Sequence, residues 1–76
     1  MTETIQIDAR GQKCPRPIIE LAKARRRHDP GTVIEIQADD LAFEVDLRAW
    51  CETTGNELSR MERDGLLVRA QVVLAQ

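Results

Sequence analysis

The sequence predicts an α+β fold: a two-layer α/β sandwich in which two helices lie on one face of a four-stranded mixed sheet. Amphipathic segments follow one another in the order β-α-β-α-β-β, and each has one polar face, as elements around a single core require. The chain has 76 residues, of which 42% are hydrophobic and 32% charged, so we expect one globular domain over residues 1–76. With one Trp, one Phe and no Tyr, its core must be aliphatic.

The first three elements are indicated by apolar spacing and by prolines. Residues 4–8 and 32–38 alternate polar and apolar side chains, which is the period of a half-buried strand. Between them, residues 16–28 show helical spacing. The helix is expected to begin at the Cys-Pro-Arg-Pro segment of residues 14–17, because proline lacks an amide hydrogen and suits only the first turn. The Asp-Pro-Gly segment of residues 29–31 ends it.

A second helix is expected after Asp39 and Asp40, whose side-chain oxygens can cap its first amides. Apolar residues follow at helical spacing: Phe43, Leu47, Trp50 and Cys51. Gly55 and Asn56 end this helix. The segments after the first and second strands are therefore long enough to be helical crossovers.

The last two strands are expected to form an antiparallel hairpin. They cover residues 57–63 and 66–74, and Asp64-Gly65 between them is typical of a type I′ turn. Leu58 and Met61 fall on opposite faces of a regular strand, which indicates a β-bulge in the third strand.

Charge is distributed unevenly along the chain, although the net charge is only -2. Residues 10–27 contain seven basic side chains and one acidic one, whereas residues 35–64 contain nine acidic and three basic ones. Cys14 lies in the basic part. We therefore expect its thiol to have cationic surroundings.

Cys14 is the residue on which we expect the chemistry to take place. It directly precedes a helix start, where unpaired amide hydrogens and the helix macrodipole stabilise an anion, and two prolines fix this geometry: Pro15 and Pro17. Three nearby cations act in the same direction: Arg10, Lys13 and Arg16. The pKa of Cys14 is thus predicted to fall below the ordinary value of about 8.5, which gives a nucleophilic thiolate. The alternative is that Cys14 only fills space at the helix start.

The motif around Cys14 also resembles that of a known family. Residues 7–17, Ile-Asp-Ala-Arg-Gly-Gln-Lys-Cys-Pro-Arg-Pro, resemble the Cys-Pro-x-Pro signature of the TusA/SirA-like sulfur carriers. The resemblance covers nearly the whole chain and continues through four further segments: Pro30-Gly31, residues 38–40, Trp50-Cys51 and residues 55–58. Leu41 and Asn56 depart from the family, which often has Pro and His there. These departures bear on subfamily and partner choice.

The resemblance implies the same β-α-β-α-β-β fold and a cysteine, here Cys14, that carries a persulfide. The implied sulfur donor is a cysteine desulfurase or a rhodanese-type sulfurtransferase, and the implied acceptor is a further sulfur-relay protein. Members of the family serve tRNA thiolation, molybdenum cofactor formation or sulfur oxidation. Such a protein is a sulfurtransferase-like carrier without independent turnover, and it needs no cofactor.

Cys51 suggests a second hypothesis. It lies on the predicted inward face of its helix and is expected to be an inert core residue. If it can be reached, it could instead pair with Cys14, and the protein would be a thiol redox sensor or a regulatory binding module. The two cysteines match no metal-site spacing, so we expect no metal.

The basic run Arg25-Arg26-Arg27-His28 could bind nucleic acid, but no aromatic platform accompanies it. We interpret it as a run of cations that complements the helix dipole or docks an acidic protein, and we expect no direct nucleic-acid partner. Asp8 is expected to order the loop that holds Cys14. The chain lacks a signal-peptide pattern and a membrane-length apolar run, so we expect a cytoplasmic protein without a membrane partner.

Overall fold

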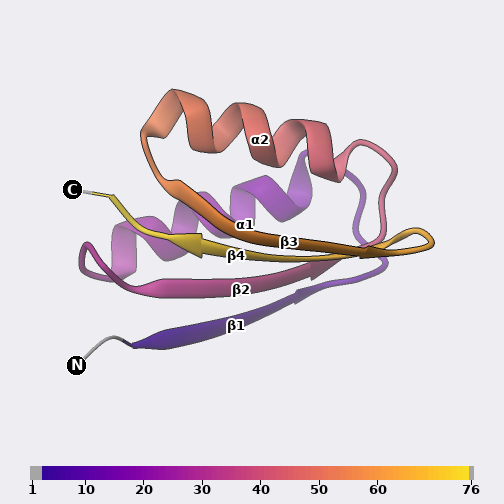
Figure 1. Cartoon of the computed structure of the whole chain (residues 1–76). Helices are drawn as coiled ribbons and strands as arrows, with labels where there is room; N and C mark the ends of the chain where they lie inside the picture. The colour runs from indigo at the N-terminus through magenta and orange to yellow at the C-terminus, as the bar shows by residue number, and fades with distance from the viewer. Residues whose placement is uncertain (1–2, 76) are drawn as a thin grey trace.

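The computed structural model describes residues 3–75 and confirms the predicted fold class. Two helices lie on one face of a four-stranded mixed sheet (Figure 1). The elements are β1 (Thr4–Ala9), α1 (Arg16–Arg27), β2 (Val33–Ala38), α2 (Phe43–Thr54), β3 (Glu57–Asp64) and β4 (Leu67–Val73). Each begins and ends within a few residues of its predicted position. No helix of the described part of the chain is long and apolar enough to cross a membrane.

The strand order is β1-β2-β4-β3, and this order decides where the loops lie. β1 and β2 are parallel and in register from Thr4↔Val33 to Ala9↔Ala38. β4 is antiparallel to both β2 and β3. Because parallel strands end at the same edge of a sheet, the loops that lead into α1 and α2 emerge side by side.

The core is aliphatic, as predicted, and lies between the helices and the sheet. Phe43, at the first turn of α2, is an aromatic residue with no exposed surface. Trp50 is partly buried and packs against the core cluster. The other fully or almost fully buried large side chains come from both helices and two strands: Leu21, Ile34, Ile36, Leu47, Val68 and Val72. Burial of this kind is the main favourable term in the stability of so small a domain.

The hairpin between β3 and β4 differs from the prediction in its turn. Asp64 pairs with Leu67, so the two turn residues are Gly65 and Leu66 rather than Asp64 and Gly65. A type I′ turn needs positive φ at both turn residues, but only Gly65 has it, at 62°. These φ values fit a type II′ turn, in which glycine occupies the first position. The predicted bulge is confirmed, since the β3 register shifts between Leu58 and Arg60.

The ends of α2 are only partly as predicted. Asp40 does not cap a helical amide: its Oδ2 accepts a hydrogen bond from the amide of Ala42, one residue before the helix, at 3.0 Å. At the other end Gly55 has φ 80° and donates its amide to the carbonyl of Cys51 at 2.9 Å, so this residue ends the helix as predicted.

Candidate functional site

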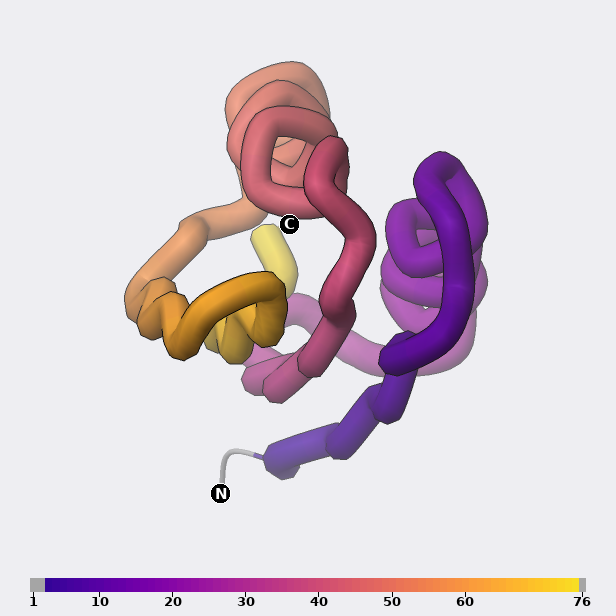
Figure 2. The backbone as a smooth tube through the Cα atoms, turned by 90° about the vertical axis from the view of Figure 1, so that its right-hand side faces the viewer, coloured from indigo at the N-terminus to yellow at the C-terminus, as the bar shows by residue number. Residues whose placement is uncertain are grey.

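The site is built where the loops after β1 and β2 meet. Figure 2 looks onto this end of the molecule and shows both loops, with the β3–β4 turn, on the side that faces the viewer. The amide of Gly11, in the first loop, donates to Oδ1 of Asp39, in the second, at 2.9 Å. Gly11 has φ 81°, a conformation that favours glycine. The loop of Cys14 is thus fixed to the loop that precedes α2.

Asp8 orders the start of the Cys14 loop, as predicted. Its Oδ1 accepts hydrogen bonds from the amide and Nε of Arg10 at 3.1 and 2.9 Å, and its Oδ2 accepts one from Nη2 at 2.9 Å. These bonds lower the pKa of Asp8 to about 2. The hydrogen bonds between Asp8 and Arg10 therefore fix the start of the loop that contains Cys14.

The start of α1 offers fewer free amide hydrogens than the sequence suggested. Pro15 and Pro17 have none, and the amide of Arg16 already donates to the carbonyl of Lys13 at 2.9 Å. Pro17 is fully buried and fixes the first turn against the core. The two prolines therefore hold the geometry of Cys14, but they also remove donors that could stabilise a thiolate.

The Cys14 thiol is partly buried and packs against the core. Burial, followed by hydrogen bonding and charge repulsion from Asp46 and then Asp40, raises the pKa of Cys14 to about 12. The prediction of a lowered pKa is therefore wrong for the isolated chain. The physical reason is first that the thiol is partly withdrawn from water, and second that the acidic α2 segment adds negative charge near it.

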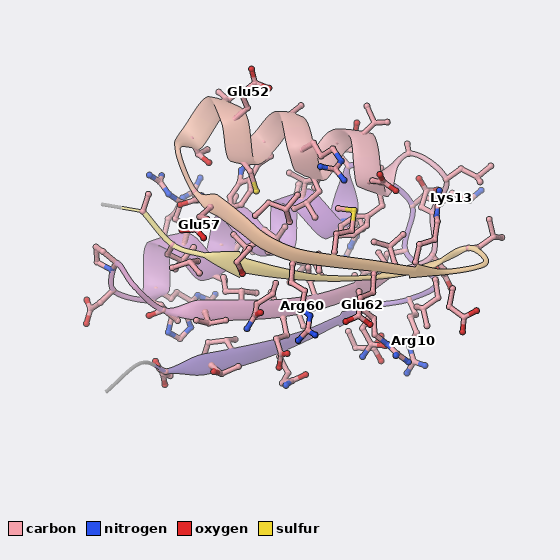
Figure 3. The ribbon with its side chains drawn as sticks, viewed as in Figure 1. Arg10, Lys13, Glu52, Glu57, Arg60 and Glu62 are labelled. Carbon is pink, nitrogen blue, oxygen red and sulfur yellow. The ribbon has the colours of Figure 1, made fainter. Side chains whose placement is uncertain are left out.

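The cations expected to activate Cys14 do not lower its pKa. Arg10 is exposed and paired with Asp8. In Figure 3 its side chain lies on the far side of the sheet from the helices, whereas Lys13 lies at the level of the helices. Lys13 and Arg16 are exposed, and neither is among the groups that shift the pKa of Cys14. Solvent screens charges of this kind strongly.

Cys51 is 6% exposed and lies in the core, as predicted. Burial raises the pKa of its thiol. Both cysteines are free thiols in the described chain. A redox pair with Cys14 would require Cys51 to be reachable, and its burial argues against that hypothesis.

Two further features lie away from Cys14. The basic run Arg25–Arg27 forms the exposed last turn of α1, at the opposite end of the helix. A shallow hollow on the open face of the sheet, where Figure 3 shows Arg60 and Glu62, is lined mainly by polar side chains and does not include Cys14. Within residues 3–75, no group of three or more His, Cys, Asp or Glu side chains is arranged to hold a metal ion.

Asp46 was not among the residues predicted from the sequence, and Asp40 was interpreted only as a helix cap. Asp46 lies three residues after Phe43 and one before Leu47, on the helical stripe that faces the core. A carboxylate on an apolar stripe, together with parallel strands that bring the two loops together, was the signal available in the sequence.

Comparison with known proteins identifies relatives of this chain. YrkF of Bacillus subtilis is 39% identical over 69 residues, covering 91% of this chain, which spans 37% of YrkF. An Archaeoglobus fulgidus protein is 39% identical over 64 residues, covering 82% of this chain and 83% of its own. Both are named putative sulfur carrier proteins. The crystal structure of a SirA-like protein from Desulfitobacterium hafniense superposes with a TM-score of 0.80 at 27% identity, covering 95% of this chain and 99% of that one.

The family model described as "Sulfurtransferase TusA" matches residues 5–72, which include the Cys-Pro-Arg-Pro segment and all of β1 to α2 apart from Thr4. Since this match covers most of the chain, and the relatives and the fold agree with it, the protein belongs to the TusA sulfurtransferase family.

Proposed function

We propose that this protein is a sulfur carrier that accepts sulfane sulfur as a persulfide on Cys14 and passes it to an acceptor protein. The observation that carries the proposal is the place of Cys14. It is the partly exposed thiol of the described chain, on a loop held by Asp8 and Asp39 at the start of a proline-fixed helix. That the group carried is sulfur is inferred from membership of the TusA family.

The transfer needs no oxidant. Sγ of Cys14 attacks the terminal sulfur of a persulfide on the donor, a new S–S bond forms, and the S–S bond of the donor breaks. The donor cysteine leaves as a thiolate and takes up the proton that Cys14 gives up. At the acceptor, a thiolate attacks the terminal sulfur on Cys14, a new S–S bond forms, the S–S bond of the Cys14 persulfide breaks, and Cys14 leaves as a thiolate that takes up the acceptor's proton.

The partners follow from this chemistry. The donor is a cysteine desulfurase or a rhodanese-type protein, and the acceptor is a thiol-bearing protein further along a sulfur relay. We place the protein in the cytoplasm, because a reducing compartment keeps thiols such as Cys14 and Cys51 unpaired. A carrier needs no enclosed substrate pocket, since each transfer takes place in a complex of two proteins.

The test is the intact mass of the protein after incubation with a cysteine desulfurase and cysteine. The wild type and Cys51→Ser should gain one sulfur atom that a reductant removes, and Cys14→Ser should gain none. If the wild type gains no sulfur from this donor or from a rhodanese-type donor, the proposal is wrong. A loss of two hydrogens, abolished by either substitution, would indicate a disulfide and support the redox-sensor hypothesis instead.

A further inference from the structure

The exposed apolar side chains of the protein gather at the end of the molecule that carries Cys14. In the described part of the chain, four large apolar side chains are exposed: Ile19 (46%), Leu41 (74%), Val45 (70%) and Leu66 (57%). Apolar residues scattered singly over a surface are normal, whereas apolar residues that gather on one part of it mark a site of interaction. The distribution of these four is therefore informative.

The topology of the sheet places all four beyond the same edge. Ala9 and Ala38 pair at the ends of the parallel strands β1 and β2, and Ala38 also pairs with Val68 at the start of β4. The segments just beyond this edge are the Cys14 loop, the loop of Leu41, the turn of Leu66, and the first turns of α1 and α2, which contain Ile19 and Val45. Figure 2 shows the starts of both helices and the β3–β4 turn on the side that faces the viewer.

Charged side chains beside these residues take part in no ion pair within the described residues. On the α1 side of Cys14 these are Lys13 and Arg16, and on the α2 side they are Asp40 and Asp46. Cations therefore lie on one side of the cysteine loop and carboxylates on the other. A complementary surface carries acidic groups toward α1 and basic groups toward α2.

We propose that Ile19, Leu41 and Val45, here called the apolar rim, form the docking surface to which the sulfur donor protein binds while Cys14 takes up its sulfur. Leu66 belongs to the sheet layer and is not included. The inference rests on the proposed function, because the transfer identifies the partner. The new S–S bond is about 2 Å long, so the donor must cover the surface around Cys14.

The rim and the charges have different tasks in this complex. Burial of the apolar rim contributes affinity, because it removes apolar surface from water. The charges on the two sides of the Cys14 loop orient the donor and speed its approach. The surface of the donor that fits is an apolar patch with acidic groups on one side and basic groups on the other. Such a complex is small and transient, as suits a carrier that must leave its donor.

The test compares how fast a sulfur donor loads rim variants. The probe is a cysteine desulfurase with cysteine, or a rhodanese-type protein with thiosulfate, whichever loads the wild type, and the gain of one sulfur is followed by intact mass below saturation. Leu41→Gln/Val45→Gln should load at least about tenfold more slowly than the wild type. Ile19→Gln, on the other helix, should also load more slowly. Thr53→Gln is the matched control: it places the same side chain at an exposed position near the far end of α2 and should load as the wild type does.

Two further measurements separate docking from the chemistry of the thiol. Alkylation by iodoacetamide needs no docking, so Cys14 should be alkylated equally fast in the double variant and in the wild type, as measured on the peptide that contains it. Loading of the wild type by the protein donor should slow when NaCl is raised from about 0.05 to about 0.5 M, because salt screens the orienting charges. This second measurement requires no variant.

Several results would overturn the inference. Equal loading of the double variant and the wild type does so while the carrier function stands, and so does a double variant with native circular dichroism whose alkylation slows as much as its loading. A wild type that sediments as a dimer, which the double variant dissociates, would show that a second copy of the chain covers the rim instead. Loading that is independent of salt would contradict the role of the charges. If neither protein donor loads the wild type, the proposed function fails and the docking surface fails with it.

Discussion

Replacement of Asn56 should destabilise the protein far more than its position at a helix end suggests. The side chain is 4% exposed. Its Oδ1 accepts a hydrogen bond from the amide of Ala75 at 2.7 Å, and its Nδ2 donates to Oγ1 of Thr54 at 2.8 Å. Asn56 therefore connects the end of α2 to the chain that follows β4.

Asn56→Ala removes both bonds and leaves the Ala75 amide without its acceptor. Each bond contributes about 1 kcal/mol net, and an unpaired donor that is partly buried costs about 1 kcal/mol more, so we expect a loss of about 2–3 kcal/mol. For a domain of this size, that lowers Tm by about 10–25 °C.

Urea unfolding followed by the fluorescence of Trp50, the single Trp of the chain, measures this loss. Ser59→Ala is the control: it removes one exposed hydrogen bond, from the Ser59 hydroxyl to the carbonyl of Gln71, and should cost less than about 0.5 kcal/mol. If Asn56→Ala costs no more than Ser59→Ala, the reasoning from burial and hydrogen bonding is wrong at this site.

Two further predictions concern the ends of the sheet. Asp8 has a pKa lowered from an ordinary value near 3.8 to about 2, so the Asp8–Arg10 pair stabilises the fold above pH 3.8 and is lost as the pH falls through about 2. NMR titration of the Asp8 carboxyl group checks this, and a midpoint near 3.8 would contradict it. Gly65→Ala places a side chain at φ 62° and should cost about 1–2 kcal/mol in urea unfolding. A neutral result would mean that the turn rearranges without strain.

Several elements could be predicted from the sequence because their signals are local. Proline fixes the start of α1, and alternating Ile residues identify β2. Leu58 and Met61 fall on opposite faces of a regular strand, which indicated the bulge in β3. The hairpin turn was assigned one residue early, since a glycine satisfies either of two turn types and the pairing of Asp64 with Leu67 decides between them. The inward position of Cys51 also followed from helical spacing alone.

The chemical state of Cys14 could not be predicted in the same way. Its neighbours in sequence are cations and prolines, and they indicated an activated thiolate. In the fold its pKa is raised, first by burial and then by Asp46 and Asp40, which are more than 25 residues along the chain. A pKa depends on all charges within a few ångströms, whatever their separation in sequence.

The sequence by itself thus determined the order of the elements, the aliphatic core and the position of Cys14 at a helix start, because these depend on local propensity and on the spacing of apolar side chains. Only the tertiary structure decided that parallel β1 and β2 bring an acidic loop against the cysteine loop. The physical reason is that strand pairing sets which loops share an edge, and the shared edge sets the electrostatic environment of Cys14.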